Sequence, residues 1–164
     1  MTLHAGDLLR YVIRPTINAL EMGGEAAEQL LLGTAIHEST VEGATRLHQI
    51  RGPALGIYQM EPATHDDIWT NWLAYQQAPR RLILGWVPNP TPDHLMFDLR
   101  YATAMARCHY RRVSESLPEA GDVLGLAEYA KQYYNTPAGK ATVAQYAAGI
   151  QLAINAINRI DAND

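Results

Sequence analysis

The sequence predicts an all-α protein that folds as one domain over residues 1–164. Apolar residues recur at helical spacing through most of the chain, and stretches that contain glycine or proline separate the helical segments. Hydrophobic residues make up 48% of the chain and charged residues 18%, a composition typical of a globular domain with a sizeable core. We expect at most a vestigial β segment, near residues 56–61.

The N-terminal part of the chain contains two predicted helices. Apolar residues follow a helical pattern over residues 7–22, but Pro15 interrupts it because proline lacks the amide hydrogen that a helix interior needs. We therefore expect a break near Arg14 or a new helix that starts at Pro15. After a pair of glycines, a second helical pattern covers residues 25–39.

The middle of the chain is predicted to be less regular. Residues 41–51 are expected to form a loop with a short helical turn. Residues 62–77 are expected to form a helix, with Thr64 as its N-cap because Asp67 follows three residues later. Three prolines in residues 78–91 predict that this stretch is mostly a connection, with room for one turn of helix over residues 80–84.

Three further helices are predicted in the C-terminal half, over residues 92–116, 122–134 and 140–160. Asn135, followed by Pro137, is a stop signal for the second of them. No internal repeat, low-complexity tract or linker separates these segments from the rest of the chain. The sequence therefore predicts one helical domain.

Glu38 occupies a position in the predicted helix over residues 25–39 where the helical pattern calls for a buried apolar side chain. It continues an apolar stripe formed by Ala27, Leu31, Thr34 and Ala35. Burial disfavours the ionised carboxylate, and the negative end of the helix dipole acts in the same direction, so the pKa of Glu38 should rise. A carboxyl group that stays protonated near neutral pH is what a general acid requires. The alternative is an ordinary solvated glutamate at a helix end.

Three short motifs carry a resemblance to a known family. They are Glu38-Ser39, Gly56-Ile57-Tyr58-Gln59-Met60 and Tyr133-Tyr134-Asn135. In this order they resemble the signature motifs of lytic transglycosylases, the soluble and goose-type lysozyme-like group. That family has a Glu-Ser pair, a Gly-Leu-Met-Gln-like turn and an Ala-Tyr-Asn-like motif. The resemblance spans residues 30–141, and residues 54–69 also look like segments of phage-encoded members.

The resemblance implies a lysozyme-like fold and cleavage of the β-1,4 bond between MurNAc and GlcNAc in peptidoglycan, with formation of 1,6-anhydro-MurNAc. It implies that Glu38 acts first as general acid and then as base. Ser39 would orient the acid or a substrate group, and Gln59 would line the sugar cleft. Tyr134 would contact the catalytic carboxylate, and Asn135 would contact the sugar.

The same positions have structural explanations as well. Ser39 can cap the helix end, Gln59 can satisfy a turn, and Asn135 can terminate a helix. Tyr58 can stack on a sugar ring or pack in the core. The chain departs from the family pattern at Ile57-Tyr58, where Leu-Met is usual, and at Gln132-Tyr133.

Two other functions stay open. A hydrolytic muramidase (a lysozyme) on the same fold needs a second carboxyl group, about 5–5.5 Å from the first in retaining enzymes and about 6.5–9.5 Å in inverting ones. The candidates for that group are Glu42, Glu61, Asp66 and Asp67. The other possibility is a non-enzymatic wall-binding or structural component of a virion.

The composition and the termini set limits on partners. The net charge of −4 argues against a general electrostatic grip on nucleic acid, so peptidoglycan glycan strands are the expected partner. We expect no signal peptide and no membrane insertion. A protein of this kind would be made in the cytoplasm. It would act on the cell wall after lysis, as part of a phage particle or through a dedicated secretion machine.

We expect no metal and no other cofactor. His37, His48 and His65 lack the spacing that a zinc-binding helix requires, because Val41 stands where its second histidine would be. Cys108 is the only cysteine, so the chain can form no internal disulfide.

Overall fold

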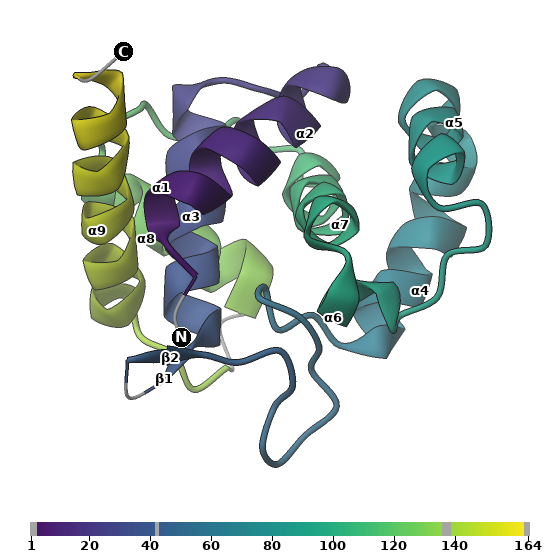
Figure 1. Ribbon diagram of the computed structural model, residues 1–164, viewed down its shortest axis with the longest axis horizontal. Helices are drawn as coiled ribbons and strands as arrows, with labels where there is room; N and C mark the ends of the chain where they lie inside the picture. The colour runs from purple at the N-terminus through teal and green to yellow at the C-terminus, as the bar shows by residue number, and fades with distance from the viewer. Residues whose placement is uncertain (1–2, 42, 136–138, 163–164) are drawn as a thin grey trace.

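The computed structural model describes residues 3–41, 43–135 and 139–162, and nearly all of their regular structure is helical (Figure 1). The predicted all-α class is therefore confirmed. The chain begins with α1 (Ala5–Leu8), the π-helical turn η1 (Leu9–Ile13) and α2 (Arg14–Ala19). The amide of Arg14 donates to the carbonyl of Leu9, one residue further back than in an α-helix, and Pro15 follows in the first turn of α2. A change of helix type thus marks the predicted break near Arg14, although the backbone stays helical across it.

The central element is α3 (Glu25–Ser39), whose bounds coincide with the prediction. Its side chains from residue 27 to residue 35 are all buried, so the expectation of a single apolar stripe was too narrow. The reason is that α1, α7, α8 and α9 all contact this helix. A helix packed on several sides needs small or apolar residues around most of its circumference.

The closest helix partner of α3 is α9 (Val143–Asp161), which runs beside it in Figure 1. Two glycines allow this approach. A Cβ at Gly33 would lie 2.5 Å from Cγ1 of Ile150, and a Cβ at Gly149 would lie 2.8 Å from the carbonyl oxygen of Gly33. A capping box between Thr142 and Gln145 fixes the start of α9. This contact brings the first turn of α9 next to the last turn of α3.

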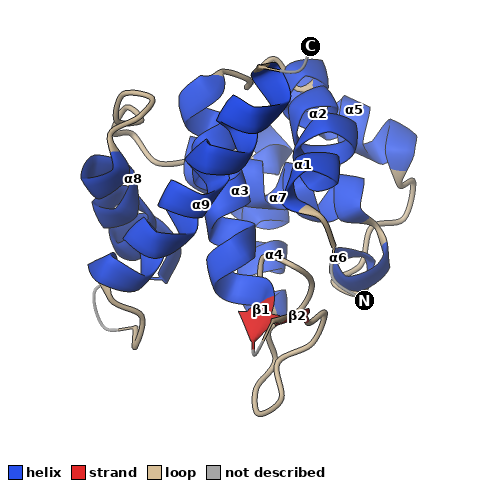
Figure 2. Ribbon diagram, turned by 60° about the vertical axis from the view of Figure 1, so that its left-hand side comes forward, coloured by secondary structure: helices blue, strands red, loops and turns tan. Residues whose placement is uncertain are grey.

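A small antiparallel hairpin follows α3, formed by β1 (Thr40–Val41) and β2 (Ala44–Thr45). The loop predicted over residues 41–51 is present from residue 46 onward, but the helical turn expected in it is absent from the described residues 43–51. β-branched threonine and valine favour extended backbone at this position. Isolated bridges between His48 and Leu55 and between Leu55 and Met60 then fold the long loop back, close to the predicted β segment (Figure 2).

The next part of the chain is more helical than predicted. It contains α4 (Pro62–Asn71), the 3-10 turn η2 (Leu73–Tyr75) and α5 (Gln77–Trp86). Helix α4 starts two residues before Thr64, so Thr64 is not its N-cap. Residues 78–91 were expected to be mostly connection, but Pro79 lies in the first turn of α5, where proline is tolerated.

The helix predicted over residues 92–116 is two helices, α6 (His94–Phe97) and α7 (Leu99–Arg111). Asp98 separates them because its side chain accepts a hydrogen bond from the amide of Tyr101, at 2.9 Å, and so caps α7. The following helix is α8 (Val123–Ala130), continued by the π-helical turn η3 (Lys131–Asn135). The predicted stop, Asn135 followed by Pro137, falls at the edge of the described residues and stays a prediction.

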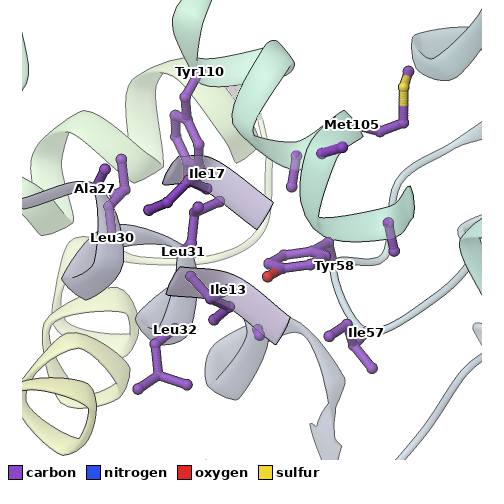
Figure 3. Close-up of a cluster of buried hydrophobic side chains, with 14 of the residues drawn as sticks. Ile13, Ile17, Ala27, Leu30, Leu31, Leu32, Ile57, Tyr58, Met105 and Tyr110 are labelled. Carbon is purple, nitrogen blue, oxygen red and sulfur yellow. The ribbon is translucent and has the colours of Figure 1, made fainter. Parts of the chain in front are cut away.

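One continuous core joins these elements. Figure 3 shows part of it, where Ile13 and Ile17 meet Leu31 of α3 and the aromatic rings of Tyr58 and Tyr110. Within the part of the chain that the structure describes, no helix combines the length and the apolar character needed to cross a membrane.

Candidate active site

A polar cavity of about 500 Å³ opens where the end of α3 meets the loop after the hairpin, the start of α4, the end of α7 and the turn η3. Four of the residues singled out in the sequence line it: Glu38, Gln59, Tyr134 and Asn135. The other lining residues are Arg46, Gln49, Ala54, Met60, Glu61, Thr64, His109, Arg112 and Tyr133. The fold therefore gathers residues from distant segments around one carboxyl group.

Glu38 lies in the last turn of α3 and is mostly buried. Its Oε1 accepts a hydrogen bond of 2.5 Å from the hydroxyl of Tyr146, in the first turn of α9. The ring of Tyr146 packs against the imidazole of His37, with the ring centroids 4.1 Å apart. The carboxyl group is thus held in one orientation by a side chain that is itself buried.

Burial is the main influence on this carboxyl group, and it raises the pKa of Glu38 above the ordinary value of 4.5. The hydrogen bond from Tyr146 and the positive charge of Arg46 act in the opposite direction but do not cancel the effect. The protonated form of Glu38 therefore persists to higher pH than that of an exposed glutamate. This is the property expected of a general acid.

Titration of Glu38 by carbon NMR is expected to give a pKa above 4.5. A general acid at this position must carry its proton, so an activity that depends on it should fall as the pH rises through that pKa. The sign follows from burial, which penalises the ionised form. A measured pKa at or below 4.5 would contradict the environment described here.

Tyrosine side chains surround Glu38 on the protein side. The nearby charge of Glu38 contributes to the raised pKa values of Tyr110, Tyr134 and Tyr146, although burial is the larger cause for each. The hydroxyl of Tyr110 is hydrogen-bonded to Thr34, one turn before Glu38, at 2.8 Å. These hydroxyl groups stay neutral near neutral pH, so they supply hydrogen bonds and no charge.

Gln59 owes its position to a tight turn. Leu55 and Met60 exchange two backbone hydrogen bonds, of 2.9 and 3.0 Å, so the four residues between them form a closed loop. Gly56 has φ +75° there, and a Cβ would lie 2.0 Å from the carbonyl oxygen of Leu95, so only glycine fits. Gln59 itself has φ +46°, a conformation that is uncommon for a residue with a side chain.

Tyr134 lines the cavity, but its hydroxyl donates to the carbonyl oxygen of Tyr58, at 2.7 Å, and not to Glu38. The contact that the resemblance implied for Tyr134 is made by Tyr146. The hydrogen bond of Tyr134 instead ties η3 to the Gln59 turn. Asn135, beside it, accepts a hydrogen bond of 2.9 Å from Lys131.

Two candidate residues do not reach the cavity. Ser39 is 4% exposed and donates its hydroxyl hydrogen to the carbonyl of Ala35, at 2.7 Å, so it completes the end of α3 and does not orient the acid. Tyr58 is 1% exposed and hydrogen-bonded to Thr103, at 3.1 Å (Figure 3). Its ring is a core side chain and is not placed to stack on a sugar, because the neighbouring helices cover it.

The four candidate carboxylates for a hydrolytic pair are placed very differently. Asp66 is exposed and bonded to His65, and Asp67 forms an ion pair with Arg112; neither lines the cavity. Glu61, just before α4, lines the same cavity as Glu38. Glu42 lies outside the described residues.

Three buried side-chain atoms lack a hydrogen-bond partner among the described residues, and all three belong to residues that line this cavity. They are Nε of Arg46, Oε1 of Gln59 and Nδ1 of His109. Buried polar atoms are usually paired, so the protein's own hydrogen bonding is incomplete around this polar cavity. Burial lowers the pKa of His109 to about 4, so its imidazole is neutral near neutral pH.

Sequence reasoning missed Tyr146, Arg46 and His109. Tyr146 follows the helical register of the apolar residues in α9, and nothing in that pattern marks its hydroxyl. Arg46 lies in a segment with no periodic signal at all. Both are brought to Glu38 by the α3–α9 contact and by the hairpin, which are long-range features of the fold.

No protein family, curated protein or solved structure with which the chain was compared matches it. In the described part of the chain, no three histidine, cysteine, aspartate or glutamate side chains lie together in a way that could hold a metal ion.

Proposed function

We propose that this chain cleaves the glycan strands of peptidoglycan as a lytic transglycosylase on a lysozyme-like helical domain. The observation that carries the proposal is the setting of Glu38. It is a buried carboxyl group with a raised pKa at the wall of a polar cavity, and the hydroxyl of Tyr146 holds it in place. The motif resemblance supplies the reaction class.

In the proposed reaction, Glu38 gives its proton to the glycosidic oxygen between MurNAc and GlcNAc while the bond from that oxygen to the anomeric carbon breaks. Ionised Glu38 then takes the proton of the 6-hydroxyl group of the same MurNAc. The 6-oxygen bonds to the anomeric carbon and closes the 1,6-anhydro ring. Glu38 ends protonated, as it began, and no water is consumed.

An intramolecular hydroxyl is a favourable nucleophile because it needs no second molecule to be positioned, and the effective concentration of such a group can reach about 10⁵–10⁸ M in well-oriented cases. The placement of Asp66 and Asp67 outside the cavity favours this route, because neither is positioned to activate water. Gln59, Tyr134 and Asn135 are the side chains available to hold the sugar.

A hydrolytic muramidase is the second candidate, and Glu61 is the observation that favours it. Its carboxylate lines the cavity that contains Glu38. If Glu61 activates a water molecule across the scissile bond, the product carries a reducing end in place of the anhydro ring. The two candidates differ in whether Glu61 is essential.

The test is to digest purified peptidoglycan with the wild-type protein and with Glu61→Gln, and to weigh the products by mass spectrometry. We expect anhydro muropeptides, lighter by one water than hydrolysis products, from both proteins. Reducing-end products together with an inactive, folded Glu61→Gln would establish the muramidase. Intact peptidoglycan in every digest would overturn both enzymatic assignments.

A further inference from the structure

Arg46 is the cation nearest to Glu38, and its place is fixed by the hairpin. Its backbone amide, directly after β2, donates to the carbonyl of Ser39, at 2.9 Å. Its Nη2 donates weakly to the carbonyl of Glu38, at 3.3 Å. The guanidinium group is thus held against the C-terminal end of α3, at the wall of the cavity.

The rest of the guanidinium group is not satisfied by the protein. Nε of Arg46 is buried and has no acceptor, and no described carboxylate forms an ion pair with it. The other arginine of the cavity, Arg112, is already paired with Asp67. Within the residues that the structure describes, Arg46 is therefore the cavity arginine without an ion pair, although its charge also acts on the carboxyl group of Glu38.

A guanidinium group presents its N–H donors as a planar fork that matches the two oxygens of a carboxylate. Arg46 lines the cavity together with Gln59 and His109, and its Nε–H, although buried, has no acceptor in the protein. The carboxylate of an acidic sugar in the cavity would offer its two oxygens to the N–H donors of Arg46. A neutral sugar would bring no negative charge to Arg46.

We propose that Arg46 binds a carboxylate of the substrate beside Glu38. This inference rests on the proposed function, which limits the carboxylate to two sources. One is the free lactyl carboxylate of a MurNAc unit that carries no peptide. The other is a carboxylate of the stem peptide, when the lactyl group is amide-linked.

Binding of a carboxylate to Arg46 would also raise the pKa of Glu38. Arg46 is the charged group that lowers the pKa of Glu38; the other side chains facing that carboxyl group are the neutral hydroxyls of Tyr146, Tyr134 and Tyr110. Glu61 and His109 line the cavity as well. A substrate carboxylate on Arg46 would offset its positive charge and let the proton stay on Glu38 at higher pH. Glu38 would then keep its proton to higher pH when a substrate is bound than when the cavity is empty.

The first test uses NMR of the wild-type protein and follows the Nε–H signal of Arg46. The protein is titrated with N-acetylglucosamine, with N-acetylmuramic acid, and with a muramyl peptide whose lactyl carboxylate is amide-linked. We expect one or both acidic ligands to shift the signal and the neutral sugar to leave it in place. A response to the muramic acid alone assigns the lactyl carboxylate, and a response to the muramyl peptide alone assigns the peptide. Equal responses to all three ligands, or no response to either acid, would overturn the inference.

The second test measures cleavage by Arg46→Gln and Arg46→Lys, with Arg51→Gln as the matched control, because Arg51 is exposed and does not line the cavity. Substrates are glycan strands with their stem peptides and strands from which an amidase has removed them. Loss of a charge-assisted hydrogen bond should raise KM about tenfold or more for Arg46→Gln. Arg46→Lys should recover part of that loss, and Arg51→Gln should match the wild type.

The proposed function and the role of Arg46 can be tested separately. A wild-type protein that cleaves no strand would sink the proposed function, while the NMR titration would still decide whether Arg46 binds a carboxylate. A wild-type protein that cleaves, with an unchanged KM in Arg46→Gln on both substrates, would overturn the role of Arg46 and leave the assignment of Glu38 standing.

Discussion

Turnover of peptidoglycan is expected to fall about 10²–10⁴-fold in Glu38→Gln, which is the range by which general acid–base catalysis accelerates reactions. Glutamine has nearly the same shape as glutamate and can accept the hydrogen bond that Tyr146 donates to Oε1. It cannot give a proton to the leaving oxygen. The measurement is the rate of release of soluble muropeptides by the variant and the wild type.

The same substitution is expected to leave the protein folded. Burial raises the pKa of Glu38, so the stability that its protonated form contributes is complete at low pH and is lost as the pH rises through that pKa. An amide does not ionise, and Glu38→Gln should therefore be at least as stable as the wild type near neutral pH, as judged by thermal unfolding. Glu128→Gln is the matched control, because Glu128 is an exposed glutamate of α8 and lies outside the cavity. Loss of a general acid should leave at most about a hundredth of the wild-type turnover. A folded Glu38→Gln that keeps more than about a tenth of that turnover would therefore remove Glu38 from the mechanism.

The local patterns of the sequence predicted the parts of the fold that depend on neighbours along the chain. The bounds of α3 follow from a glycine pair before it and a β-branched pair after it, and both signals act within a few residues. The change of helix type before Pro15 has the same local origin. The expectation for Glu38 also rested on one helix, and the raised pKa agrees with it.

The errors arise where tertiary structure overrides a local signal. Pro79 suggested a connection, but a proline in the first turn of a helix costs little, and α5 forms around it. Asp98 could have been recognised as an N-cap, since a helical pattern resumes directly after it, yet the apolar periodicity on both sides concealed the break. The single stripe expected on α3 was too narrow because the sequence does not reveal how many helices surround it.

The candidate site shows the same division between residues that local motifs mark and residues that only tertiary contacts bring together. Gln59 and Tyr134 were found because short motifs mark them, although Tyr134 turned out to bond the backbone of Tyr58. Tyr58 was ambiguous, because an aromatic ring in a turn can face the solvent or the core, and only the packing of α7 against that turn decides. Tyr146 could not be distinguished from its apolar neighbours, since a buried tyrosine and a buried isoleucine follow the same helical register.

Tyr146→Phe is expected to lower turnover by about tenfold to a hundredfold. The hydroxyl donates to Oε1 of Glu38 at 2.5 Å, and a hydrogen bond to an ionisable partner contributes about 1.5–3 kcal/mol, where each factor of ten in rate is about 1.4 kcal/mol. Without it, the carboxyl group is free to rotate away from the scissile bond. The ring itself should stay in place, because Tyr146 is fully buried and packs against His37.

The pH dependence separates this positioning role from a purely structural one. The hydrogen bond from Tyr146 lowers the pKa of Glu38, so its removal should raise that pKa. The fall of activity with rising pH should then occur at higher pH in Tyr146→Phe than in the wild type, while kcat changes more than KM. Tyr129→Phe removes a comparable hydroxyl, which donates to the carbonyl of Glu115 outside the cavity, and should change neither kcat nor the pH profile. An unchanged pH profile in Tyr146→Phe would mean that the hydroxyl stabilises the packing of α9 on α3 and takes no part in holding the acid.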